Sequence, residues 1–393
     1  MSLVHRSWTS PAQRVLRRNV KLHSYDQLHK FSKENMAGPH VRGLSYVYTP
    51  YSGLGGYDIA PSTHWKLLAD TLSRCPNIRQ LSVKSLYRFL SKETEYKNFC
   101  RDRNTNDIDL VYSSIKDLVN LEALVFDVDL RFVQTSRLLL DFYSILPDLR
   151  NLQYLQAIVW RIDFGNDDED DIELITSIPD RSPPPSLKKL ALHLVSPFTP
   201  VPLLKWLLRP SGEYHLEELI IDRPEWHQGK EMELRAQLHG SDSFASAQRV
   251  RFIDYAETNE YVRPNKAFIT PIVNLLSSVR DLELYWDYSE RLVELPRLTT
   301  RIPIENLTVC IASYGYYAAR TADKELFPWI ERQSFPNLRR FRVRRLCPYS
   351  SEESPSEDRF PLITEACKNA KISLELDFEA RRIEDLYESV YVP

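Results

Sequence analysis

Glycine is scarce in this sequence, which has 10 glycines in 393 residues, whereas ~7 % is usual. Phosphate-binding loops, nucleophile elbows and close backbone approaches to a cofactor rely on glycine. The richest stretch, "SGLGGYD" at 52–58, is not followed by Gly-Lys-Ser/Thr. It predicts a surface loop, or a loop that contacts a partner, and no phosphate site.

Cysteine pairs and long apolar runs are also missing. The five cysteines are an odd number and widely spaced, with no CxxC pair and no Cys/His cluster at metal-ligand spacing. This usage predicts reduced thiols in the cytoplasm or nucleus, with no metal site and no cofactor. No stretch approaches the about 18 apolar residues of a membrane span, so we expect no contact with a membrane.

Charge of one sign is not in excess, because 51 Lys and Arg stand against 54 Asp and Glu, for a formal net charge of −3. A chain that binds nucleic acid or a membrane surface along its whole length is usually more basic. We therefore do not expect nucleic acid as a partner.

Motifs of catalysis are incomplete. "DFG" at 163–165 imitates the magnesium motif of kinases, but the HRD-type loop and the glycine-rich loop with its lysine are missing. The acidic run "NDDEDDIE" at 166–173 lacks the spacing and central glycine of a calcium loop, and predicts a solvated loop. The nine histidines have no recurrent acidic or thiol neighbour, so we predict no catalytic residues.

What the sequence does contain is a repeated phrase, apolar-x-x-apolar-x-apolar. Clear copies are "NIRQLSV" at 77, "NLEALVF" at 120, "SLKKLAL" at 186, "HLEELII" at 215, "SVRDLEL" at 278, "IENLTV" at 304 and "NLRRFRV" at 337. With weaker copies included, the first apolar residues, here called anchors, are Val41, Ile78, Leu121, Leu152, Leu187, Leu216, Ala247, Val279, Ile304 and Leu338. The stretch "ISLELDF" at 372 ends the series in this interpretation.

Each phrase belongs to a larger unit. Its later apolar positions alternate with polar ones, which is typical of a strand with one buried face. Segments with helical spacing precede most phrases and predict helices before Ile78, Leu152, Leu216, Val279 and Leu338. In "HWKLLADTLSRC" at 64–75, Trp65, Leu68 and Leu72 share one helix face. Turns such as "CPN", "LPD" and "FPN" separate helix from strand. A unit of about thirty residues cannot bury both elements alone, so the sequence predicts stacked units.

The phrase LxxLxL with a helix on the return leg resembles the leucine-rich repeat over roughly residues 40–380. The resemblance implies an α/β leucine-rich-repeat solenoid, a horseshoe, which we assign to residues 25–393. The asparagine that normally follows LxL in the family is missing from these copies.

The first residues resemble the C-terminal half of an F-box, in the form found in fungal proteins. The matching residues are Leu3, Val4, Arg6, Trp8, Ala12, Gln13, Leu16, Arg18, Val20 and Leu22. Residues 1–24 are therefore interpreted as a short helical F-box remnant, with Leu3, Val4 and Trp8 on its adaptor side. The Leu-Pro-x-Glu helix of family F-boxes is missing, so we expect either a reading frame that starts upstream or a loss of adaptor binding.

An F-box followed by leucine-rich repeats is typical of substrate receptors of cullin-RING ubiquitin ligases. The resemblance implies a non-catalytic subunit that binds a Skp-type adaptor with its cullin complex, and an unknown protein substrate. The alternative is a stand-alone leucine-rich-repeat scaffold that binds a protein but recruits no ligase.

Leucine-rich solenoids bind partners on a concave sheet, lined by the strand residues that alternate with the buried ones. The sign of charge changes from unit to unit along these positions, which favours a protein partner over a polyanion. In "NLRRFRVRR" three arginines fall on one strand face, a stripe that would suit phosphates or an acidic peptide. The candidate partner-binding residues are Lys84, Asp127, His193, Asp222, Arg251, Glu283, Tyr285, Arg340, Arg342 and Arg344.

Overall fold

A computed structural model places about half of the chain in regular elements and turns. The structure describes residues 18–33, 38–48, 61–85, 107–127, 136–158, 181–193, 206–207, 216–222, 247–253, 279–287, 303–312, 316–331, 335–346 and 360–381. The stretches "SGLGGYD", "DFG" and "NDDEDDIE" lie outside these residues.

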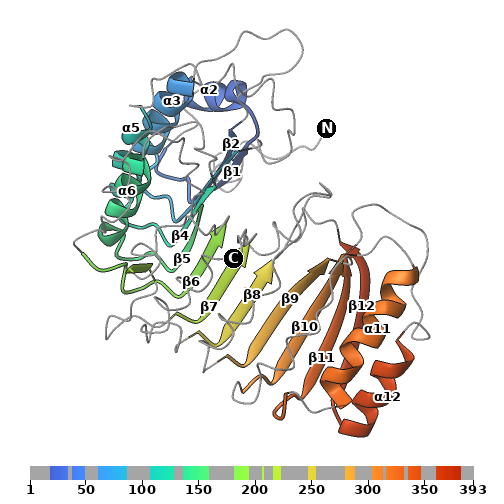
Figure 1. Ribbon diagram of the computed structural model, residues 1–393. Coiled ribbons are helices and arrows are strands. Elements are labelled where there is room, and N and C mark those ends of the chain that lie inside the picture. Colours follow the sequence, from blue (N-terminus) through green and yellow to red (C-terminus); the bar gives the residue numbers. More distant parts are fainter. Residues whose placement is uncertain are drawn as a thin grey trace, which may run out of the picture. The chain divides into compact units, whose positions relative to one another are not determined.

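Parallel strands form a 12-stranded sheet in which the strands follow one another in chain order, from β1 to β12 (Figure 1). The predicted α/β class is confirmed, because sequentially adjacent parallel strands joined through helical segments are the arrangement of a leucine-rich-repeat-like solenoid. The chain divides into two compact units, the first with β1–β5 and the second with β6–β12.

The first unit contains the strands β1 (Asn19–Leu22), β2 (Gly43–Tyr48), β3 (Gln80–Ser85), β4 (Ala123–Asp127) and β5 (Tyr154–Ile158). Its helices are α2 (Tyr25–Lys33), α3 (Pro61–Ser73), α5 (Ile108–Lys116), α6 (Ser136–Ile145) and the short 3₁₀ turn η2 (Leu146–Asp148). The four α-helices lie in a row along one face of the strands (Figure 1). The helices predicted before Ile78 and Leu152 are thus confirmed as α3 and α6.

The second unit contains β6 (Lys189–His193), β7 (Glu218–Asp222), β8 (Arg249–Ile253), β9 (Asp281–Asp287), β10 (Asn306–Ala312), β11 (Arg340–Leu346) and β12 (Ser373–Arg381). Its described helices are α11 (Tyr316–Glu331) and α12 (Pro361–Ala370). Strand β12 confirms that "ISLELDF" continues the series. The helix predicted before Leu338 is confirmed as α11, whereas the segment before Val279 lies outside the described residues.

Backbone hydrogen bonds keep neighbouring repeats in register. Arg42 stands just before β2, and its carbonyl accepts the N–H groups of Arg79 (2.7 Å) and Gln80 (3.0 Å) at the start of β3. The same pair of hydrogen bonds recurs at the carbonyls of Arg18, Arg79, Glu122, Glu217, Gln248, Arg280 and Glu305. Because one carbonyl holds the start of the next strand each time, equivalent residues face each other across neighbouring strands.

Side chains in the turns add to this stacking. The amide of Asn77 donates to the carbonyl of Pro39 (3.0 Å), and the amide of Asn151 donates to the carbonyl of Val119 (2.9 Å). Each asparagine stands directly before an anchor. Asparagine therefore joins neighbouring repeats from the turn before the strand, not from the position after LxL.

The core lies between the helices and the buried strand face. All ten anchors are buried, as the repeat phrase predicted, and so are Trp65, Leu68 and Leu72 on one face of α3. A polar contact joins helices α11 and α12 of the second unit. The buried carboxylate of Asp323 on α11 accepts the backbone N–H groups of Leu362 (3.2 Å) and Ile363 (2.9 Å). It thereby caps the first turn of α12, whose own N-terminal residues supply no side-chain cap.

An aromatic cluster fills the core of the first unit. Phe126 of β4 stacks on Phe142 of α6 with ring centroids 4.9 Å apart, and Tyr112 of α5 packs 5.7 Å from each of them. Tyr143 and Trp206 extend the cluster, with centroids 6.3 Å apart. The cluster joins two helices to the sheet across neighbouring repeats, which one repeat alone could not do.

A buried histidine joins helix to strand near the start of the sheet. The Tyr46 hydroxyl on β2 lies 2.7 Å from Nδ1 of His64 on α3, and the Tyr25 ring meets the imidazole edge-on, with centroids 4.7 Å apart. Burial disfavours the charged form of the ring and lowers the pKa of His64 from 6.5 to about 4.

We predict that this histidine makes the fold acid-sensitive. Between pH 6.5 and 4 the unfolded chain binds a proton at His64 that the folded chain does not, so stability is lost as the pH falls, by about 3 kcal/mol once both pH limits are passed. The variant His64→Asn should lose this part of the pH dependence in urea unfolding measured from pH 7.5 to 4. The control His40→Asn removes an exposed histidine, and a pH dependence equal in all three chains would contradict a neutral buried His64.

Candidate functional site

The outer face of the second unit consists of the strand side chains that alternate with the buried ones. Eleven charged residues on this face, six cationic and five anionic, are called the charge lattice here. They are Lys189, Glu218, Arg249, Arg251, Asp281, Glu283, Arg340, Arg342, Arg344, Glu375 and Asp377. Strand alternation sends these side chains away from the apolar core, and the shared register places them in rows.

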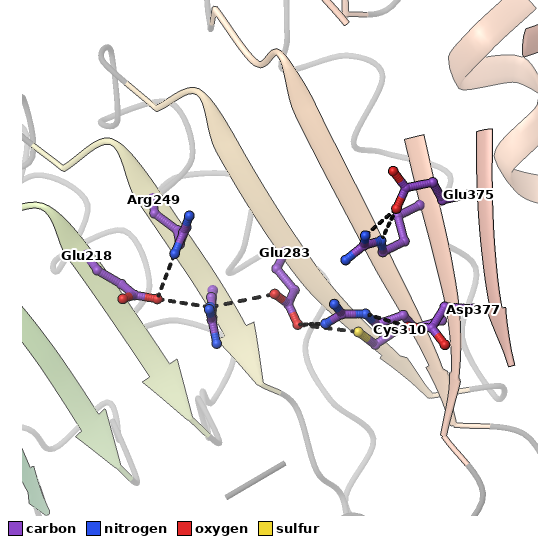
Figure 2. Close-up of polar contacts among 9 residues, drawn as sticks. Glu218, Arg249, Glu283, Cys310, Glu375 and Asp377 are labelled. Atoms are coloured by element: carbon purple, nitrogen blue, oxygen red, sulfur yellow. Dashed lines mark hydrogen bonds and ion pairs between the residues drawn. The ribbon is translucent and has the colours of Figure 1, made fainter. Parts of the chain in front are cut away.

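A chain of ion pairs crosses the lattice from β7 to β12 (Figure 2). Arg251 Nε lies 3.0 Å from Glu218 Oε1 and 3.6 Å from Glu283 Oε2. Arg344 continues the chain, with Nη1 3.5 Å from Glu283 Oε1 and Nε 3.4 Å from Asp377 Oδ2. The Nε contacts are ion pairs outside hydrogen-bond geometry. The five charges alternate in sign across six strands, so each has an opposite charge beside it.

A gap in the charge on β10 makes this chain possible. The outer residues Thr308 and Cys310 of β10 are small and uncharged, and Cys310 stands directly between Tyr285 and Arg344 in register. The buried Cys310 thiol lies 3.5 Å from Glu283 Oε1. Because the Cys310 side chain is short, the long arginine of β11 passes over it to reach the glutamate of β9.

A second row of alternating charges runs along the strand starts. Arg249 stands directly opposite Glu218 and Asp281, with nitrogen-to-oxygen distances of 4.0 Å and 3.5 Å. Glu218 also pairs with Lys189 at 3.6 Å, and Asp281 accepts the side-chain amide of Asn306. The cation Arg249 is thus neutralised from both sides.

The arginines at the other end of this face share a carboxylate. Arg342 places Nε 2.7 Å from Glu375 Oε2 and brings Nη2 to the same oxygen. Arg340 pairs with the other oxygen, with Nε 3.0 Å from Glu375 Oε1. The stripe predicted as a phosphate or acidic-peptide site is therefore partly neutralised by β12 and by Glu283.

The structure brings five of the predicted partner-binding residues into the lattice: Arg251, Glu283, Arg340, Arg342 and Arg344. Of the others, Lys84 and Asp127 face each other in register on β3 and β4 of the first unit. His193 and Asp222 face each other on β6 and β7, and Tyr285 faces Cys310.

The predicted adaptor-side residues Leu3, Val4 and Trp8 lie outside the described residues. The end of the F-box-like stretch does lie within them. Val20 and Leu22 belong to β1, which pairs in parallel with β2 as the first strand of the sheet. Residues 19–22 are therefore part of the repeat architecture.

Glu375 and Asp377 are the lattice residues that the sequence interpretation left out of the candidate set. The signal was present, because both alternate with Leu374 and Leu376 in the last phrase. Their importance follows only from register, which sets Glu375 opposite Arg342 and Asp377 opposite Arg344.

Metal clusters and membrane-spanning helices are not found among the described residues. In the described part of the chain, no three His, Cys, Asp or Glu side chains converge as a metal would require, and no helix is long and apolar enough to span a membrane. The described cysteines Cys75, Cys310 and Cys367 are buried thiols.

Comparison with known proteins adds no assignment. No protein-family model matches the chain, and no curated protein matches it significantly. Any functional proposal must therefore start from the chain's own residues.

We predict that Glu283 contributes measurably to the stability of the fold through the charge lattice. Its side chain is 13 % exposed and serves both Arg251 and Arg344, so Glu283→Gln should lower the free energy of unfolding by about 2 kcal/mol by leaving two half-buried guanidiniums short of charge. Urea unfolding at low salt measures this.

The matched control is Glu305→Gln. Glu305 also serves two arginines, Arg280 at 3.9 Å and Arg339 at 3.7 Å, but those arginines are largely exposed. Exposed pairs are worth about 0–1 kcal/mol, so this variant should unfold near the wild-type midpoint. Equal effects of the two variants would show that the lattice gains nothing from its burial.

Proposed function

We propose that this chain is a non-catalytic protein-binding repeat protein whose partner docks on the outer face of strands β6–β12. The observation that carries the proposal is the charge lattice, whose residues come from six of the seven consecutive strands β6–β12. Its six cations and five carboxylates nearly cancel, so it has no surplus that would attract a polyanion. Mixed charges fixed in a pattern instead give specificity toward a protein surface with the complementary pattern.

Exposure on this face is graded in a way that suits docking. Lys189, Arg249 and Arg340 are about half exposed, whereas Glu218 and Glu283 are nearly covered. The nearly covered Glu218 therefore holds Lys189 and Arg249 in place, and these two cations remain open to a partner. Such preorganisation lowers the entropy that would otherwise be lost when long side chains are ordered on binding.

The finer form of the proposal is a substrate receptor of a cullin-RING ubiquitin ligase. It rests on the F-box resemblance of residues 2–22 and on the order of that stretch before the repeats. In this form Leu3, Val4 and Trp8 contact a Skp-type adaptor, the outer face holds the substrate, and other subunits perform catalysis. The alternative is a stand-alone repeat scaffold in the cytoplasm or nucleus that binds a protein but no adaptor.

Photo-crosslinking tests the docking face. A benzoyl-phenylalanine that replaces Ser373, which is exposed on β12 beside Arg340, should crosslink a protein partner in cell extract. The crosslinked product should survive nuclease treatment, because the partner is a protein. The same group at Lys368, exposed on α12 of the same unit, is the matched control and should not. Labelling from Lys368 alone, or equally from both positions, would mean that the partner does not choose the outer face.

Co-expression with a Skp-type adaptor separates the two forms. A ligase receptor should co-purify with the adaptor, and Trp8→Ala should abolish the complex without changing crosslinking at Ser373. A chain that crosslinks its partner at Ser373 yet never retains the adaptor is the scaffold.

A further inference from the structure

The arginines of the charge lattice differ in what stands opposite them. Each of the other five lattice cations has an acidic residue directly across on a neighbouring strand. Arg340 has Asn306 on one side and Ser373 on the other, and neither carries a charge. It must reach diagonally to Glu375, which already stands opposite Arg342.

Glu375 cannot fully satisfy both arginines. Arg342 occupies Oε2 with two hydrogen bonds, whereas Arg340 has only an ion pair to Oε1, through Nε. A guanidinium has five N–H donors in a planar fork. Among the described residues, no hydrogen bond reaches the two Nη groups of Arg340, and its side chain is 55 % exposed.

The surroundings reinforce this surplus of positive charge. Arg339, directly before Arg340, also shares its carboxylate, because Glu305 serves both Arg280 and Arg339. Arg339 and Arg340 at the start of β11 thus each share a carboxylate with another arginine. At the equivalent position of β8, Arg249 has Glu218 and Asp281 on its two sides.

We infer that Arg340 binds an acidic side chain of the docked protein. That side chain presents a carboxylate to the open Nη edge of this guanidinium. The inference rests on the proposed docking face and names the chemistry of its partner. A carboxylate fits better than a phosphate, because one guanidinium edge is open at Arg340 and Arg342 already uses two of its nitrogens on Glu375. A phosphate with nearly two charges is usually held by a cluster of arginines.

The test uses three labelled peptides of equal length and fluorescence anisotropy at low salt. One carries Asp and Glu between Gly and Ser residues, the second has Asn and Gln in their place, and the third has phosphoserine. The acidic peptide should bind the full chain more tightly than the amide peptide. Arg340→Gln should weaken binding of the acidic peptide about tenfold or more, because it removes a charge-assisted contact.

Two further variants give the test its direction. Arg249→Gln removes an equally exposed but fully paired cation and should change the affinity by less than about twofold. Glu375→Gln releases both Arg340 and Arg342 and should tighten binding of the acidic peptide, an effect that a merely structural role would not produce. Unchanged urea midpoints for Arg340→Gln and Arg249→Gln show that these variants are folded.

The outcomes decide the inference separately from the docking face. Equal binding of the acidic peptide to wild type and Arg340→Gln, equal binding of acidic and amide peptides, or binding of the phosphoserine peptide alone would overturn it. If crosslinking at Ser373 persists while Arg340→Gln has no effect on peptide binding, the docking face stands and only the role of Arg340 is wrong. If no partner crosslinks from Ser373, the docking face itself fails, whatever the peptides do.

Discussion

The register between neighbouring parallel strands is the constraint on which this structure depends. At eight of the strand junctions one carbonyl accepts two N–H groups of the next repeat, so that strand starts at the same height as its neighbour. The apolar residues of all repeats then meet in one core, and the intervening residues meet in rows on the other face. A slip of one residue would exchange the two faces and bury charges such as Arg251 in place of Val250.

The core and the lattice therefore stabilise the same register. Burial of the anchors provides most of the driving force, because each anchor is almost completely removed from water. The charges contribute less energy but more selectivity, since the alternation of sign from Glu218 to Asp377 is satisfied in only one alignment of the strands. The uncharged β10 matters for the same reason, because an acidic or basic residue at Cys310 would interrupt the contact between Arg344 and Glu283.

Local pattern was enough to predict the repeat strands, their faces and some of the helices, whereas α2, α5 and α12 were not predicted. The phrase around Leu338 predicts β11 with Phe341 and Val343 inside and three arginines outside, and this is how they lie. The pairings were beyond the sequence, because Glu375 meets Arg342 across 33 residues and Glu283 meets Arg344 across 61. Only a known register turns such separations into contacts. His64 was equally hidden, since its polar partner Tyr46 occupies a strand position that reads as ordinary core.

A neutralised lattice with one open guanidinium selects partners in two ways. It attracts a partner with a suitable acceptor, and it raises the free energy of a complex that buries the guanidinium without one. A docked protein that covers Glu218, Arg251 and Glu283 removes water from charges that already have partners, so their mutual attraction strengthens as the local dielectric falls. Arg340 behaves differently, because covering it without an acceptor would leave its donors buried and unsatisfied, at about 1–3 kcal/mol or more. A surface of similar shape that lacks an acidic residue at this point is therefore rejected. Discrimination of this kind needs only the one position on β11 where register leaves a cation without an acid opposite.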